Sequence, residues 1–193
     1  MRQAMRTSAE AMPVMDERVR KGAVVASATL LIAACAHIAF PLWFTPVPVT
    51  LQPFAVLLLG LLMTPGMAAT TMALYLAEGA LGLPVFTPHG LGGAAQLMGP
   101  TGGYLMSYPV VAPLISWLWR QGSRGFARTL AITTGGSLIT LALGAIWLEM
   151  LTHASARLLM GSAIVPFLPG DAVKVLAAAA MASSWMRIRS NPK

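Results

Sequence analysis

Charged residues are scarce in this chain. They make up 10% of its 193 residues, while 56% of the residues are hydrophobic. Soluble domains carry roughly a quarter charged residues, so this composition leaves no room for a soluble catalytic module and predicts an integral membrane protein.

Cysteine is scarcer still. The single Cys35 lies inside an apolar run, so it can form no intramolecular disulfide and is expected to be a small packing residue.

Motifs for metal, nucleotide and nucleic acid are also missing. No histidine or cysteine has a second one at ligand spacing, so no metal site is predicted. The stretch Gly-Pro-Thr-Gly-Gly at 99–103 lacks the lysine of a phosphate-binding loop, so the chain is not expected to hydrolyse ATP itself. The net charge is +7, but the basic residues gather at the ends and in one short segment, without interleaved aromatics. That distribution is typical of membrane topology and argues against a nucleic-acid partner.

Hydrophobic runs divide the chain into a polar leader, residues 1–22, and a membrane domain, residues 23–193. Six apolar segments are expected to be helices: 23–40, 49–63, 67–83, 103–119, 129–151 and 170–186. A spanning helix needs about 20 residues, so the second segment is short, and the prolines around it predict an irregular start. The predicted fold is therefore an all-α, multi-pass membrane protein with six transmembrane helices.

The basic residues predict the orientation of these helices. Eleven of the thirteen Lys and Arg residues fall in three clusters, which lie in the leader, between residues 120 and 128, and after residue 186. With six helices all three clusters fall on one side, which the positive-inside rule makes cytoplasmic. Both termini are therefore expected in the cytoplasm, and Arg157 and Lys174 in the outer half of the molecule.

The connections expected on the outer side carry little charge. They cover residues 41–50, 84–103 and 161–170, and they are rich in proline, glycine and aromatic residues. Non-helical backbone near membrane depth is tolerated only where it is buried in protein or lines a cavity. We therefore expect these connections to form a lid over an outward-facing pocket.

An acid and a base, Asp171 and Lys174, stand three residues apart at the start of the last apolar run. In a helix they share one face, and Asp171 lies in the first turn, where it could cap free backbone N–H groups. Ionisable residues inside membrane spans are costly and by default indicate function. The structural alternative is that Asp171 only caps the helix while Lys174 extends to the outer interface.

Further polar residues stand near other expected helix ends. Thr50 and Gln52 precede or begin the second segment, and Tyr104 begins the fourth; such groups suit a small, partly polar ligand. Glu78 follows Tyr75 by three residues, so the two share a helix face, and Glu78 could line a pocket or remain at the interface.

Glu149, His153 and Arg157 are spaced four residues apart, which favours a self-satisfied row of ion pairs on a helix. Read differently, Glu78 or the Glu149/His153 pair would supply acid–base groups to a small intramembrane enzyme. No catalytic motif accompanies them, so no enzyme is predicted.

Four motifs follow one another in the chain: TPVPVTLQPF at 45–54, LYLAEGALGLPVF at 74–86, LMGPTGGYL at 97–105 and PFLPGDAVK at 166–174. With them the chain resembles the BioY family, the biotin-specific substrate-binding (S) components of energy-coupling-factor (ECF) transporters. The resemblance covers essentially the whole chain after the leader. It implies an S-component fold that captures biotin at the outer face and mediates its uptake across the bacterial inner membrane.

The resemblance also implies which residues bind biotin. Asp171 and Lys174 match the family's signature acid and base, while the motifs around Thr50/Gln52 and around Gly102, Gly103 and Tyr104 match stretches that shape the pocket. Tyr75 and Glu78 complete the predicted set. Biotin offers a ureido group with N–H donors and a carbonyl acceptor, an apolar sulfur ring and a carboxylate, to which an aspartate and an ammonium can bind. The residues leave open which end of biotin each of the two meets.

The expected partners are biotin as the transported ligand, membrane lipids, and no cofactor. The family resemblance adds an ECF transmembrane coupling protein with two ATPase subunits. The first helix carries only loose substitutes, Gly22/Ala26 and Ala23/Ser27, for the Ala-x-x-x-Ala pattern expected for docking to that protein, so a homo-oligomer or a form that works alone is the alternative. Two rival functions are an S component for another vitamin, such as thiamine or riboflavin, and an oligomeric scaffold protein.

Overall fold

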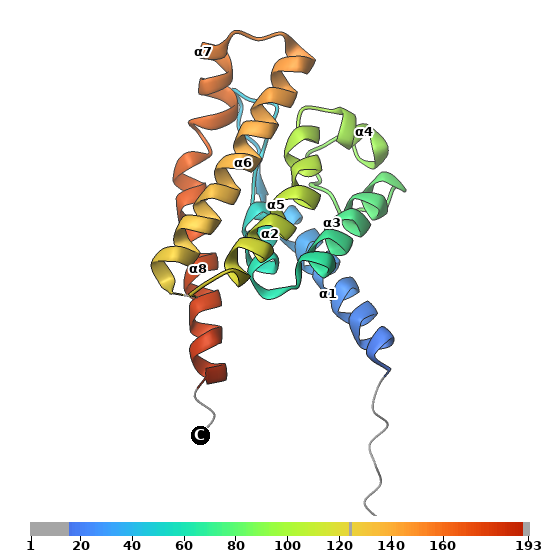
Figure 1. Cartoon of the computed structure of the whole chain (residues 1–193). Coiled ribbons are helices and arrows are strands. Elements are labelled where there is room, and N and C mark those ends of the chain that lie inside the picture. Colours follow the sequence, from blue (N-terminus) through green and yellow to red (C-terminus); the bar gives the residue numbers. More distant parts are fainter. Residues whose placement is uncertain (1–15, 124, 191–193) are drawn as a thin grey trace, which may run out of the picture.

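Helices joined by short connections make up most of the chain in the computed structural model, which describes residues 16–123 and 125–190 (Figure 1). In chain order the helices are α1 (Glu17–His37), α2 (Gln52–Leu62), α3 (Pro65–Ala80), α4 (Gly93–Met98), α5 (Gly102–Arg120), α6 (Phe126–Thr152), α7 (Ala156–Leu159), the π-helix η1 (Met160–Ile164) and α8 (Leu168–Ser190). Two short strands, β1 (Ala39–Phe40) and β2 (Val49–Thr50), pair antiparallel, with Ala39 opposite Thr50.

Each of the six predicted apolar segments overlaps one helix, namely α1, α2, α3, α5, α6 and α8. β2 and α4 lie in the connections 41–50 and 84–103, where neither a strand nor a short helix was predicted, because elements of two to six residues leave no hydrophobic period to detect. β1 occupies the last two residues of the predicted segment 23–40, so the prediction that the helix continues to residue 40 is wrong: α1 ends at His37. α1 begins at Glu17, inside the predicted leader, and residues 1–15 of that leader lie outside the described residues.

Proline and threonine set the starts of the short helices. α3 has Pro65 in its first turn, where the missing N–H is not needed, and the hydroxyl of Thr64 accepts a hydrogen bond from the Met67 N–H at 3.4 Å. α2 likewise has Pro53 in its first turn. Local sequence therefore makes two separate helices from residues 52–80, with a sharp turn between them.

Helix length and hydropathy show which helices could cross a membrane. Of the described helices, α1 and α6 are each long and apolar enough to cross a membrane, and α7/η1 with α8 meets the same test as one span bent by 45°. α2 has 11 residues and is therefore about 16 Å long, well below the ~30 Å of a bilayer core. α2 is instead a core helix.

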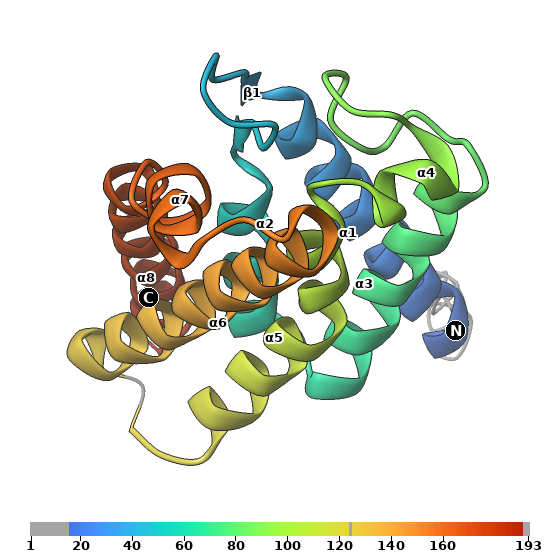
Figure 2. The same ribbon diagram turned by 90° about the horizontal axis from the view of Figure 1, so that it is seen from above.

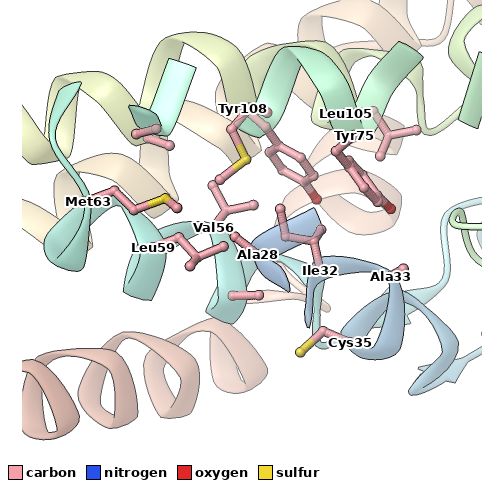
Figure 3. Close-up of a cluster of buried hydrophobic side chains, with 14 of the residues drawn as sticks. Ala28, Ile32, Ala33, Cys35, Val56, Leu59, Met63, Tyr75, Leu105 and Tyr108 are labelled. Carbon is pink, nitrogen blue, oxygen red and sulfur yellow. The ribbon is translucent and has the colours of Figure 1, made fainter. Parts of the chain in front are cut away.

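The core of the bundle surrounds α2, which packs against α1, α3, α5 and α8. Ala55 through Leu61 of α2 are buried, and the hydrophobic side chains of α1, α2, α3 and α5 meet in one cluster (Figure 3). Cys35 lies in this cluster and is buried, so the prediction that it packs in the interior is confirmed.

The two ends of the bundle differ. The start of α1, the connection between α5 and α6, and the C-terminal end of α8 lie at the lower end in Figure 1. The strands, α4 and the connection between α6 and α7 lie at the upper end. The described parts of the segments that carry the three basic clusters therefore share one end of the bundle.

Candidate ligand-binding site

A pocket lies among elements of the upper half of the bundle. Its walls come from the β1–β2 hairpin, α2, α5, α6, α8 and the connection between α3 and α5. Residues from all three predicted outer connections contribute, among them Val47, Thr87 and Phe167. The cavity therefore lies where segments distant in sequence meet.

Asp171 and Lys174 lie side by side in the α8 wall of this cavity. The Lys174 Nζ donates to Asp171 Oδ1 at 2.8 Å, and each side chain is less than a tenth exposed. The second carboxylate oxygen, Oδ2, accepts from the Ser137 hydroxyl of α6 at 2.9 Å. The ion pair is thus buried, and a third residue from another helix holds its acid in place.

The structure shows what holds each member of this pair. Both oxygens of Asp171 accept from side chains, and α8 begins three residues earlier, at Leu168. Lys174 is buried and does not extend to the outer interface. Breaking a buried pair by removing one partner is strongly destabilising, so such a pair is not a neutral feature of a helix end.

A chain of hydrogen bonds begins at the start of α2. The Thr50 hydroxyl donates to Gln52 Oε1 at 3.3 Å, and Gln52 Nε2 donates to the Tyr75 hydroxyl at 2.6 Å. Tyr75 in turn donates to the Val85 carbonyl at 2.8 Å. Because the Tyr75 hydroxyl uses its hydrogen on Val85, it must accept from the amide of Gln52, which turns Gln52 Oε1 toward Thr50 and the cavity. Thr50 and Gln52 line the cavity, and Tyr75 supports them from behind.

The α5 wall depends on two glycines. A Cβ on Gly103 would lie 2.2 Å from Trp147 Cβ, and one on Gly102 would lie 1.9 Å from the Leu97 carbonyl oxygen. No side chain fits at either position, so α5 approaches α6 closely enough for Tyr104 to line the cavity. Gly102 and Gly103 therefore act through packing and do not themselves line it.

Tyr104 is anchored at both ends of its side chain. Its ring packs against Gly144 of α6, where a Cβ would come within 2.3 Å of the ring, and its hydroxyl donates to the Ala163 carbonyl in η1 at 2.8 Å. Phe167 lies beside the ring with 6.2 Å between centroids. An apolar surface with few polar atoms results, as is typical of small-molecule pockets.

Glu78 points away from this cavity. Its Oε1 accepts from the Thr29 hydroxyl of α1 at 3.2 Å, so it joins α1 to α3. Of the nine predicted site residues, the structure brings five together in the cavity wall: Thr50, Gln52, Tyr104, Asp171 and Lys174. Tyr75, Gly102 and Gly103 lie one layer behind, and Glu78 lies at the α1–α3 contact.

The predicted row of ion pairs at Glu149, His153 and Arg157 does not form among the described residues. α6 ends at Thr152, and His153 takes a left-handed conformation with φ 51°, so the helical spacing is lost. All three side chains are exposed. They are therefore removed from the buried, low-dielectric setting that acid–base chemistry uses. The described part of the chain also holds no group of three or more side chains that could bind a metal.

Several residues of the site were not predicted. Ser137 and Thr140 stand three residues apart on α6, and both are buried, Ser137 against Asp171 and Thr140 in the cavity wall. Thr87, from the connection after α3, lines the cavity as well. A serine or threonine in an apolar run is common in membrane helices. Ser137 and Thr140 could therefore have been identified only from knowing which face of α6 packs against α8 and the cavity.

Fold and cavity together define a class, a helical membrane protein with an internal, partly polar pocket at one end. The chain belongs to the BioY family, whose sequence profile matches residues 4–191. The resemblance inferred from the four motifs is thereby confirmed.

Several characterised relatives agree. The chain is 37% identical to the biotin transporter BioY of Thermotoga maritima over 154 residues, which is 80% of this chain and 88% of that protein. It is 33% identical to biotin transporter BioY2 of Lactococcus lactis over 79% of this chain and 82% of that protein. The biotin transporter BioY of Rhodobacter capsulatus is 33% identical over 84% of this chain and 90% of its own.

A solved structure matches the fold. It is the 2.1 Å crystal structure of the S-component for biotin from an ECF-type ABC transporter, with a TM-score of 0.81 and 27% identity over 92% of this chain and 95% of that chain. Family and fold are therefore those of a transporter's substrate-binding component.

Proposed function

We propose that this chain captures biotin at the outer face of the membrane and mediates its uptake, and that it is not an enzyme. The observation that carries the proposal is the buried Asp171–Lys174 pair in the wall of the cavity. Membership of the BioY family and the biotin transporters among the relatives support it.

The ion pair suits the ureido group of biotin. Oxygen atoms of a carboxylate accept hydrogen bonds, so Asp171 can receive the ligand's N–H groups. The Lys174 ammonium has three hydrogens and uses one on Asp171, so it can donate another to the ureido carbonyl. A carboxylate at this position would instead meet the like charge of Asp171. We therefore assign the ureido end of biotin to α8, with Gln52 and Tyr104 beside it.

The six helices that match the predicted segments would all belong to the membrane domain, with α2 buried at its centre. Both termini would then be cytoplasmic in the inner membrane of a bacterium, because the three basic clusters share one end of the bundle. The likeness to an S-component supports association with an ECF coupling protein and its ATPase subunits. In that case the loaded chain would tilt in the membrane to release biotin inside.

Ligand titration tests the proposal directly. The purified full-length chain in detergent is titrated with biotin, thiamine and riboflavin, alongside Asp171→Asn and the exposed control Glu17→Gln. Tight binding of biotin alone, lost in Asp171→Asn and kept in Glu17→Gln, is the expected result. Micromolar or weaker biotin binding beside tight binding of another vitamin would overturn it. Uptake by cells that express this chain alone, compared with cells that also express a coupling module, then distinguishes solitary from coupled transport.

A further inference from the structure

A second polar cluster lines the cavity, formed by Thr87, Gln96 and Thr101. These residues come from the connection between α3 and α5, which includes α4. In the view from above, α4 lies on the far side of the bundle from α8, with α2, α5 and α6 between them (Figure 2). The connection that carries the cluster therefore lies across the bundle from the helix that carries Asp171 and Lys174.

The hydrogen bonds of Gln96 fix what this cluster presents. Gln96 Oε1 accepts from the Gly92 N–H at 3.2 Å, and its Nε2 donates to Thr101 Oγ1 at 2.7 Å. The Gln96 amide keeps a second hydrogen, and Thr101, which accepts from Gln96, keeps its own hydroxyl hydrogen. Both residues can therefore donate to an acceptor atom in the cavity.

Thr87 adds a hydroxyl without a partner. Its residue is 6% exposed, and its Oγ1 is buried and makes no hydrogen bond with any described residue. A buried hydroxyl without a hydrogen bond is costly, and native proteins leave few of them. Because Thr87 lines the cavity, a ligand atom is the natural partner.

The second polar cluster carries no charged side chain. Among the described residues that line the cavity, Asp171 and Lys174 are the charged ones, and they pair with each other. The second cluster is neutral and rich in donors, so it suits acceptor oxygens. Gln96 and Thr101 also line an adjoining hollow with His89 and Gly90, so this side lies next to the mouth.

We propose that Thr87, Gln96 and Thr101 bind the carboxyl end of the ligand through neutral hydrogen bonds, without a cation. This inference rests on the proposed function and names the end of biotin that α8 does not hold. Donors of this kind bind a carboxamide oxygen as they bind a carboxylate oxygen. The ligands of the pocket therefore include amides of biotin as well as the free acid.

Thr87 provides the test. Purified full-length chain is titrated with biotin and with biotinamide, as wild type, Thr87→Val, Thr87→Ser and the control Thr133→Val. Thr133 is equally buried but bonds only to carbonyls of its own helix. Wild type is expected to bind the amide within tenfold of biotin. Thr87→Val should weaken biotin binding by about tenfold, the effect of one lost hydrogen bond, while Thr87→Ser and Thr133→Val bind as wild type.

The outcomes separate the two proposals. If wild type does not bind biotin, the proposed function fails. If it binds biotin but Thr87→Val binds equally well, or the amide binds more than tenfold weaker, the neutral subsite is overturned. His89→Gln provides a further check, because the exposed His89 at the mouth is the alternative cation. A loss of affinity above tenfold in His89→Gln would assign the carboxylate to His89 instead.

Discussion

The two walls of the cavity differ in how their polar groups are satisfied. On the α8 side, Asp171 bonds to Lys174 and Ser137, so both its oxygens have partners before any ligand arrives. On the opposite side, Thr87 is buried without a partner among the described residues. The charged wall is therefore preorganised by the protein, whereas the neutral wall leaves its hydrogen-bonding capacity for the ligand. Because the protein already orders and pairs the two charged side chains, less binding free energy is lost in ordering them when the ligand arrives.

The largest effect is expected from separating the charges. Asp171→Asn leaves the Lys174 ammonium buried without its counter-ion, so the free energy of unfolding should fall by about 3–5 kcal/mol, seen as a lower thermal midpoint in detergent. The double variant Asp171→Asn/Lys174→Met should recover much of that stability and still fail to bind biotin.

The chain offers a matched control for this experiment. Lys21 and Glu17 form an ion pair with the same 2.8 Å distance, but their side chains are 57% and 66% exposed. Glu17→Gln should leave the thermal midpoint unchanged, since exposed pairs contribute little. If the double variant at the cavity is no more stable than Asp171→Asn, burial of an unpaired charge is not the cause.

Removing the hydroxyl behind the acid is expected to have an intermediate effect. Ser137→Ala takes away the donor to Asp171 Oδ2, and a hydrogen bond to a charged group contributes about 1.5–3 kcal/mol. Biotin affinity should fall by at least tenfold, as measured by titration, and Ser137→Thr should restore it. Ser162→Ala, which removes an exposed hydroxyl that donates to the Leu158 carbonyl four residues earlier, should bind biotin normally. Equal affinities in Ser137→Ala and wild type would show that Lys174 alone orients the acid.

The smallest effect is expected from the link between the walls. Tyr75 connects Gln52 of α2 to the Val85 carbonyl, which lies two residues before Thr87. Tyr75→Phe keeps the ring and its packing on Phe86 but removes the hydroxyl, so stability should fall by about 1 kcal/mol for the net loss of hydrogen bonding. Biotin affinity should fall a few-fold, because the Gln52 amide is then free to turn over. Unchanged binding would mean that Thr50 is enough to hold Gln52.

Features that depend on charge could be predicted from the sequence. Asp171 and Lys174 were identified because charges are rare in such a chain and their spacing puts them on one helix face. Hydropathy likewise located the helices, since each of the six apolar segments overlaps one. Which neighbouring helix each side chain contacts could not be predicted in the same way. Glu78 and Tyr75 share a helix, but Glu78 turns to Thr29 of α1 while Tyr75 turns to Gln52.

Residues of the connection between α3 and α5, which includes the short helix α4, were the least predictable part of the site. Thr87 and Gln96 carry no periodicity, and their position over the cavity depends on how the connection between α3 and α5 folds back on the bundle. The predicted ion-pair row at Glu149 failed for a related reason. Spacing shows neighbours only while the helix continues, and the left-handed turn at His153 ends it.

The π-helix η1 has a consequence for the direction in which α8 presents its charges. A π turn contains one residue more than an α turn, and each residue of an α-helix rotates the next side chain by about 100°. The number of residues between 160 and 164 therefore sets the angular phase of the helix that follows. For Asp171 and Lys174 to point inward, the count of residues in this turn matters more than their identity, so a deletion here would be felt more than a substitution.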